Sequence, residues 1–199
     1  MANVERTMEN LQKRGFRVSR FADRDAAARY LLQEIGGRSV GIGGSVTIGE
    51  LDLYPQLLAR GEVFWHTEQP GDATIAQANA APVYLMSANG VSELGTIINI
   101  DGRSNRVANM CYGHERVYII IGINKIAPSD EMALWRARNI ASPKNARRLH
   151  KKTPCAYGEP KCHDCDTRDR ICCTFVTLER RPSGIPHFEV VIVDEALGY

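Results

Sequence analysis

The sequence has 199 residues, 44% of them hydrophobic and 24% charged, and a formal net charge of +2 at pH 7. This length and composition predict one globular domain over residues 1–199, and the small net charge disfavours nucleic acid as a partner. The chain lacks the roughly 18 consecutive apolar residues that cross a bilayer and the apolar stretch of a signal peptide, so we expect a cytoplasmic protein with no membrane partner.

Patterns typical of helices and strands alternate along the chain. Asp23 is a candidate helix N-cap, and Gly36 with Gly37 would end that helix. Helices are expected at residues 2–14, 23–37, 48–61, 73–80 and 130–141, and strands at 16–21, 39–45, 62–67, 82–88, 95–100, 116–126, 174–182 and 187–197, the last two at hairpin-like distance. This alternation predicts an α/β fold with an open, mostly parallel sheet flanked by helices, in which residues 1–35 are an N-terminal helical lead-in.

The segment GIGGSVTIGE places three glycines and a serine between a buried strand and a helix. Gly43, Gly44 and Ser45 would let backbone amides approach a ligand closely, and the start of the following helix favours negative charge. The spacing matches neither the dinucleotide fingerprint nor the phosphate loop, so no nucleotide cofactor is identifiable. An anion site and a plain tight turn, with Ser45 as an N-cap, both stay open.

Residues 87–106, SANGVSELGTIINIDGRSNR, carry a second group of polar side chains, of which Asn89, Asn99, Asp101, Asn105 and Arg106 are the candidate ligand-binding residues. Polar groups at strand ends are where α/β sheets usually bind ligands. A β-hairpin with Asx turns would need similar residues. In a site, Arg106 would offer two parallel N–H groups to the carboxylate or phosphate of an anionic small molecule, with Asp101 and Asn105 holding it in place.

Five of the six cysteines lie in residues 155–173, CAYGEPKCHDCDTRDRICC. Cys155, Cys162, Cys165 and Cys172 have the spacing C-x6-C-x2-C-x6-C, and its central C-x-x-C lets two sulfurs face one ion. The segment 153–175 has little apolar content, so a metal would supply the order that it lacks. Four thiolates suit zinc or an iron–sulfur cluster, and the spacing does not separate these cofactors. Reduced thiols and disulfides are the alternatives.

Several motifs together resemble the lactate-utilisation (LUD) domain family. They are GGSVTIGE, SANGVSELGTIINIDGRSNRVA, GINKI and RARNIASPKNARRLHKKTPC, in the family's order from about residue 35 onward. The resemblance implies the open α/β sheet shared with sugar-phosphate isomerases and CoA transferases. It also implies a role in oxidising L-lactate to pyruvate beside an iron–sulfur subunit. The cysteine-containing, single-domain subset carries the pattern matched by Cys155, Cys162, Cys165 and Cys172, which leaves Cys173 as an extra thiol.

Two other functional classes remain open from the sequence. An isomerase or CoA-transferase type of enzyme would act on a phosphorylated or acyl-CoA substrate, with Glu50 or Glu93 as its carboxylate. A zinc-containing nucleic-acid-binding protein would use the basic run 136–152, which is otherwise a solvated helix face and linker. Cys111 with His114 makes a poor nucleophile–base pair, because Cys111 lies against a buried strand where a small hydrophobic residue packs well.

Overall fold

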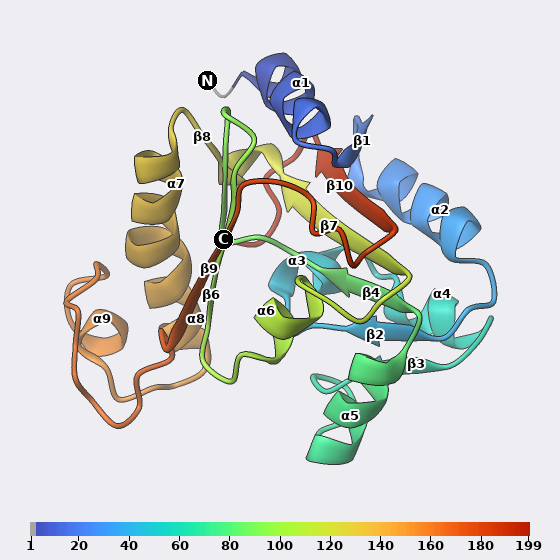
Figure 1. The fold of residues 1–199 in the computed structure, drawn as a ribbon. Coiled ribbons are helices and arrows are strands. Elements are labelled where there is room, and N and C mark those ends of the chain that lie inside the picture. Colours follow the sequence, from blue (N-terminus) through green and yellow to red (C-terminus); the bar gives the residue numbers. More distant parts are fainter. Residues whose placement is uncertain (1–2) are drawn as a thin grey trace.

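The computed structural model describes residues 3–199 and contains two β-sheets (Figure 1). The main sheet is parallel throughout, with the strand order β1-β10-β7-β4-β2-β3. Its strands are β1 (Arg17–Phe21), β2 (Val40–Ile42), β3 (Val63–Trp65), β4 (Val83–Met86), β7 (Arg116–Gly122) and β10 (His187–Val193). This sheet and its flanking helices confirm the predicted fold class.

The second sheet is smaller and has the order β8-β5-β6-β9. Its strands are β5 (Gly90–Ser92), β6 (Ile97–Asp101), β8 (Ile126–Ala127) and β9 (Thr174–Leu178). Strands β5 and β6 are antiparallel neighbours, so the hairpin that residues 87–106 suggested is present. The proximity of β9 and β10 in sequence was misleading, because β9 pairs with β6 while β10 enters the main sheet between β1 and β7.

All five predicted helical ranges are helical, one of them divided. The helices are α1 (Val4–Lys13), α2 (Arg24–Ile35), α3 (Val46–Glu50), α4 (Tyr54–Leu58), α5 (Asp72–Ala80), α6 (Asn105–Asn109), α7 (Asp130–Arg136), a π-helical stretch (Ala137–Ala141), α8 (Ser142–Arg148) and α9 (Pro154–Tyr157). Of these, α6, α8 and α9 were not predicted. The helix expected at 48–61 is divided into α3 and α4, because Asp52 has a left-handed φ of 50° and Pro55 lies in the first turn of α4. The strand expected at 116–126 ends at Gly122 and continues as a 3-10 turn (Ile123–Lys125).

Each face of the main sheet is covered, which explains why its strands are apolar on both sides. Along β7, Val117, Ile119 and Ile121 belong to a core that includes residues of α1, α5, α6 and the small sheet. Tyr118 and Ile120 point the other way, into a core formed with α2, α3 and α4. The alternation of side chains along a strand therefore places two cores on either side of one sheet.

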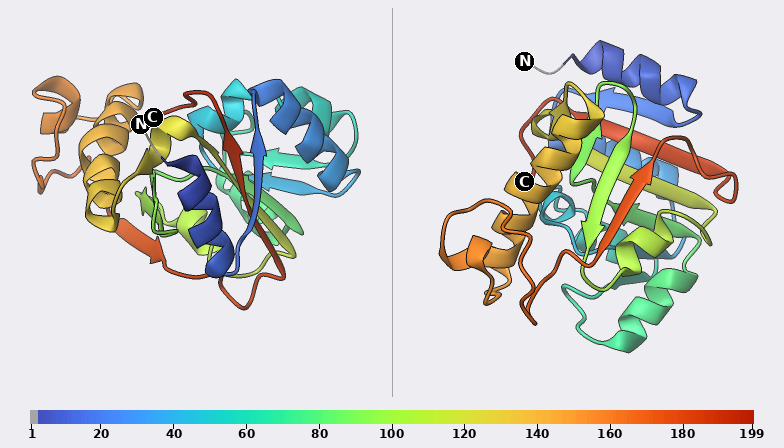
Figure 2. Two further views of the ribbon diagram at one scale, coloured as in Figure 1. Left: turned by 90° about the horizontal axis from the view of Figure 1, so that it is seen from above. Right: turned by 60° about the vertical axis from the view of Figure 1, so that its left-hand side comes forward.

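A further layer lies beyond the small sheet. Ile98 and Ile100 of β6 pack against Ala133 of α7 and Ala137 of the π-helical stretch, and Figure 2 shows α7 and α8 on the side of the small sheet that faces away from the main sheet. The cysteine-rich loop follows α9 at the outer end of this layer (Figure 1). Among residues 3–199 no helix combines the length and apolar character that crossing a bilayer requires.

The contact of α5 with β2 depends on Gly41. A Cβ atom at this position would overlap the carbonyl oxygen of Ala78 and lie 2.9 Å from its carbonyl carbon. We expect Gly41→Ala to lower the free energy of unfolding by about 1–3 kcal/mol in urea denaturation, as overpacking of a buried contact does. Gly49→Ala is the matched control, because the added Cβ would lie 3.7 Å from Trp65 in a helix; it should be neutral or stabilise by up to about 1 kcal/mol. Equal effects of the two substitutions would contradict this account.

Candidate functional site

A cavity of about 580 Å³ opens where β2, β4 and β7 end. Because these strands are parallel, the segments that follow them meet at one edge of the sheet. The small sheet, the end of α8 and the cysteine-rich loop form the other walls. The residues that line it include Gly44, Ser45, Thr47, His66, Ser87, Asn89, Asp101, Arg103, Asn105, Arg106, Lys125, Ser142, Arg148, Lys151, Arg168, Asp169, Arg170 and Ile171. Six of the eight predicted ligand-binding residues are among them.

The glycine turn and Arg106 are in contact. A Cβ atom at Gly43 would lie 2.9 Å from Cγ of Arg106 and 3.1 Å from the hydroxyl of Tyr84, so only glycine leaves room for the arginine to cross the turn. Gly43 itself is outside the cavity lining, whereas Gly44 and Ser45 are part of it. The Ser45 side chain accepts the N–H of Ile48 at 3.3 Å and is the N-cap of α3. The turn thus has the capping role that the sequence left open, and it also borders the cavity.

Arg106 is held in one orientation by Asp101. Its Nε donates to Asp101 Oδ2 at 3.0 Å and its Nη2 donates to the carbonyl of Ile100 at 2.8 Å. The other carboxylate oxygen of Asp101 accepts the N–H groups of Arg103 and Ser104, closing the turn after β6. Within residues 3–199, Nη1 of Arg106 makes no hydrogen bond. The guanidinium is therefore held on its Nε and Nη2 side. Its Nη1 can still donate hydrogen bonds, and the Arg106 side chain lines the cavity.

The three predicted asparagines have different positions. Asn89 lines the cavity, and its Oδ1 accepts the N–H of Ile100 at 2.8 Å. Asn105 also lines it, but no hydrogen bond joins its side chain to Arg106 in the described chain. Asn99 is fully buried, accepts the N–H of Asn89 and contacts Met110. Asn99 thus supports the loop that carries Asn89 and lies outside the cavity lining.

Lys125 was not among the predicted site residues, although it lies in the motif GINKI. It follows β7 and is only 3% exposed. Its Nζ donates to Thr47 Oγ1 at 2.7 Å and to Ser87 Oγ at 2.8 Å. Burial, together with the charges of Arg136 and Arg106, lowers the pKa of Lys125 to about 7, and the charge of Glu50 acts in the opposite direction. No local pattern marks this lysine in the sequence, because a single lysine after a strand is usually solvated.

His66 is a second cavity residue that the sequence did not single out. It follows β3, and its Nε2 would lie 3.2 Å from a Cβ atom at Gly44. Burial lowers the pKa of His66, the charges of Arg103 and Arg106 lower it further, and Asp101 has the opposite effect. The imidazole is therefore biased toward its neutral form by the cations of the site.

The two carboxylates considered for a transferase mechanism lie elsewhere. Glu93 accepts the N–H of Asn3 at 2.9 Å and pairs with Arg6, and Glu50 accepts the N–H of Gly198 at 2.7 Å. Asp101 and Asp169 are the carboxylates among the described residues that line the cavity. The site consequently contains neither of the proposed glutamates.

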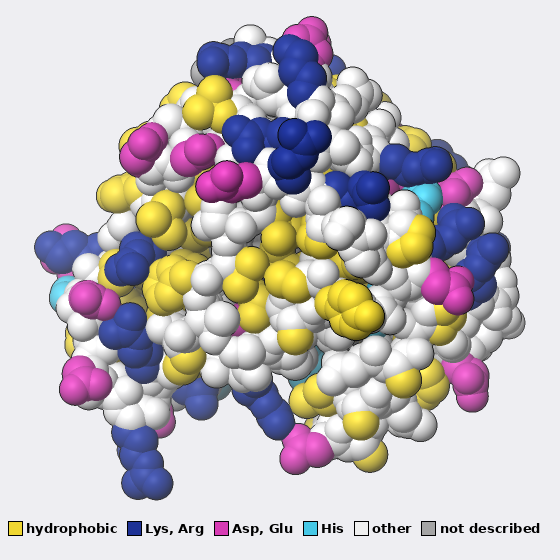
Figure 3. Space-filling view, viewed as in Figure 1, with side chains coloured by type: hydrophobic (Ala, Val, Ile, Leu, Met, Phe, Trp, Pro, Cys, Tyr) yellow, Lys and Arg dark blue, Asp and Glu magenta, His cyan; other side chains and the backbone are white. Residues whose placement is uncertain are grey.

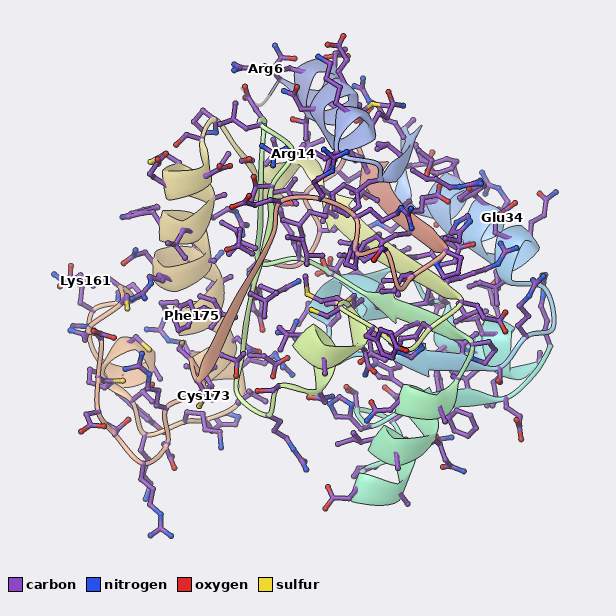
Figure 4. The ribbon with its side chains drawn as sticks, viewed as in Figure 1. Arg6, Arg14, Glu34, Lys161, Cys173 and Phe175 are labelled. Atoms are coloured by element: carbon purple, nitrogen blue, oxygen red, sulfur yellow. The ribbon has the colours of Figure 1, made fainter. Side chains whose placement is uncertain are left out.

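Cys155, Cys162, Cys165 and Cys172 surround one smaller cavity of about 30 Å³, beside His163 and Asp164. The Sγ of Cys162 accepts the N–H of Asp164 at 3.4 Å, inside the C-x-x-C turn, where Asp164 has a left-handed φ of 44°. The Cys173 thiol does not line this cavity and instead donates a hydrogen bond to the carbonyl of Arg170. Figure 4 shows Cys173 at the junction of this loop with β9, and Lys161 at its outer edge.

The four thiols fit a tetrathiolate site in kind and number. Burial raises the pKa of the Cys172 thiol, and the charges of Cys162 and Cys155 raise it further, as expected for neighbouring thiols. A finished ligand set is absent, however: within residues 3–199 no group of three or more His, Cys, Asp or Glu side chains has a metal-binding arrangement.

The cysteine loop and the large cavity share a wall. Ser142, Arg170 and Ile171 line both spaces. Arg170 donates to the carbonyls of Cys165 and Cys172 at 2.7 and 2.9 Å and pairs with Asp164. The N–H of Cys173 binds the carbonyl of Asp101, at the turn that holds Arg106. Order in the cysteine loop is therefore linked directly to the shape of the larger cavity.

The parallel sheet, its flanking helices and the polar cavity at its carboxyl edge define an open α/β protein. The LUD domain family model matches residues 4–193, and the chain belongs to that family. A search of curated proteins finds no match. Among solved structures, a DUF162 family protein from Deinococcus radiodurans has a TM-score of 0.57 and 13% identity, with 96% of this chain and 95% of that chain covered. At this identity the likeness concerns the fold.

The cations around His66 generate a testable pKa shift. We expect Arg103→Gln to raise the pKa of His66, because it removes a positive charge that disfavours the imidazolium. NMR titration of the imidazole measures this shift, and Arg29→Gln on the exposed face of α2 is the control. In the wild type the folded protein binds a proton on the His66 imidazole more weakly than the unfolded chain does. Protonation of His66 should therefore lower the free energy of unfolding as the pH falls below about 6.5. An unchanged pKa in Arg103→Gln would contradict the assignment.

Proposed function

We propose that this LUD domain protein binds an anionic small molecule in the large cavity and acts in the oxidation of L-lactate to pyruvate. The observation that carries the proposal is the charge of the lining. Besides the buried Lys125, six Lys and Arg residues line the cavity, against Asp101 and Asp169. This excess of positive charge is concentrated at the cavity, since the net charge of the whole chain is only +2. A concave site with one sign of charge favours a ligand of the opposite sign.

Arg106 is the best-defined anion contact. Asp101 fixes its orientation through Nε, and the unpaired Nη1 leaves a donor for a carboxylate or phosphate oxygen. Holding an arginine in place before the ligand arrives reduces the entropy lost on binding. The cavity volume of about 580 Å³ is within the range of small-molecule sites and exceeds what lactate alone would fill. A cofactor or a larger anion would fit the same space.

The role beside an iron–sulfur subunit rests on the LUD resemblance and on one surface. Helix α7 exposes Met132, Leu134 and Trp135, at 45%, 37% and 50%. In Figure 3 hydrophobic side chains appear on the α7 side and gather across the middle of that face. An exposed group of large hydrophobic residues on one helix supports a protein partner.

The metal part of the proposal assigns Cys155, Cys162, Cys165 and Cys172 to one zinc ion or iron–sulfur cluster. Its support is the shared small cavity and the N–H contact to the Cys162 sulfur. Bound there, the metal would stabilise the loop that forms part of the anion cavity.

Thermal unfolding tests the anion site. L-lactate, pyruvate and inorganic phosphate are added at equal ionic strength, with sodium chloride as the reference. A ligand at 100 times its Kd should raise Tm by about 5–10 °C, which corresponds to about 2.7 kcal/mol for a domain of this size. Arg106→Gln should abolish most of the shift, whereas Arg29→Gln should retain it. The proposal fails if none of these anions stabilises the wild type, or if Arg106→Gln responds as the wild type does.

Metal analysis of protein purified without oxygen tests the cysteine site. We expect about one zinc ion or one iron–sulfur cluster per chain. Cys162→Ser should lose the metal and speed proteolysis within residues 159–172, because the loop has few apolar contacts of its own. Cys173→Ser is the matched control and should behave as the wild type, since this thiol lies outside the small cavity. Metal-free protein in which all four thiols react freely with an alkylating agent would refute the assignment.

A further inference from the structure

The amine of Lys125 is buried, and no carboxylate within residues 3–199 forms an ion pair with it. Its Nζ contacts two hydroxyl oxygens, of Thr47 and Ser87, at 2.7 and 2.8 Å. The charged groups that act on it are Arg136, Arg106 and Glu50, and the Glu50 carboxylate already accepts the N–H of Gly198. An ammonium group in this place would gain little from ion pairing, and its desolvation would be costly.

The hydrogen bonds around Nζ match a neutral amine. The Ser87 hydroxyl donates its own hydrogen to the carbonyl of Ile120 at 2.6 Å, and the Thr47 hydroxyl is directed to the carbonyl of Leu197 at 3.5 Å. Both hydroxyl oxygens therefore accept from Nζ. A neutral amine has two N–H groups and one lone pair, so two accepted hydrogen bonds use both donors and leave the lone pair. An ammonium would keep a third N–H without a protein acceptor.

We propose that Lys125 is the nucleophilic amine of the cavity and forms an imine with a carbonyl compound whose acid group is held by Arg106. The ligand class is an aldehyde or ketone that carries a carboxylate or phosphate, such as a 2-oxo acid. This inference rests on the proposed anion site and names its substrate class. Lysines kept neutral by burial and by neighbouring cations are activated for this chemistry, and burial with nearby arginines lowers the pKa of Lys125 to about 7.

The step balances without a further reactant. The Nζ lone pair attacks the carbonyl carbon and a C–N bond forms. The carbonyl oxygen takes a proton while the nitrogen gives one up, which produces a carbinolamine. The C–O bond then breaks, water leaves, and a C=N bond remains. Thr47, whose hydroxyl contacts Nζ and makes only a long hydrogen bond of 3.5 Å to the carbonyl of Leu197, is placed to relay the proton between nitrogen and oxygen.

Reductive trapping on the full chain tests the proposal. The protein is incubated at pH 7.5 with sodium cyanoborohydride and either glyoxylate, an acid-bearing aldehyde, or formaldehyde, its uncharged counterpart. Labelled lysines are located by peptide mass spectrometry. At this pH about three quarters of an amine with a pKa near 7 is neutral, against about one in a thousand for an exposed lysine. We expect glyoxylate to label Lys125 at least about tenfold faster than the exposed Lys13, Lys144, Lys152 or Lys161, which lie outside the cavity.

Two comparisons separate this inference from the anion site on which it rests. In Arg106→Gln, the ratio of glyoxylate labelling to formaldehyde labelling at Lys125 should fall to the ratio found for the exposed lysines. In the wild type, inorganic phosphate should slow the labelling of Lys125 by glyoxylate. Labelling of exposed lysines ahead of Lys125, or an equal response of Lys125 to both aldehydes, overturns the inference. Because the labelling is measured on wild-type protein, the result does not depend on a Lys125 variant that folds. Anion-induced thermal stabilisation without labelling of Lys125 would overturn the imine and leave the anion site in place.

Discussion

The parallel alignment of β2, β4 and β7 is the constraint on which the cavity depends. Because their carboxyl ends share one edge, the glycine turn after β2, Ser87 after β4 and Lys125 after β7 are brought together although they are far apart in sequence. The turn can accept Arg106 from α6, which follows the small sheet's β6, only because Gly43 has no side chain. A buried sheet with fixed register thus places four separate chain segments within one site.

Polar residues that directly follow apolar strands were the useful signal in the sequence. Gly44, Ser45 and Asn89 could be predicted to meet, because they follow β2 and β4, which are parallel neighbours in one sheet. Arg106 also reaches this place, but it follows β6, whose neighbours are antiparallel, so the parallel sheet alone does not account for it. Lys125 could not be identified in the same way, since a single lysine after a strand is usually solvated. Its significance depends on burial, and burial depends on Thr47 and Ser87 from other segments.

The distance between two strands along the sequence was less informative about which of the two sheets each strand joins. The segments of β9 and β10 look like a hairpin, but their burial differs: β9 alternates between partly buried and exposed residues, whereas six of seven β10 residues are buried. A strand buried on both faces belongs in the centre of a parallel sheet, and an alternating one suits an edge. The burial of Asn99 could not be predicted for a similar reason. The face of β6 on which Asn99 lies depends on the pairing of β6 with β9.

The position of β10 between β1 and β7 also bears on how the chain folds during synthesis. Strand β1 ends at Phe21, and its hydrogen-bonded neighbour in the sheet begins at His187. At about 5–20 residues per second, the ribosome needs on the order of ten seconds to make the intervening chain. During that time α1 and α2 can form as local helices, while β1 has no strand to pair with. The amino-terminal part of the domain is therefore the first to be made and among the last to join the sheet.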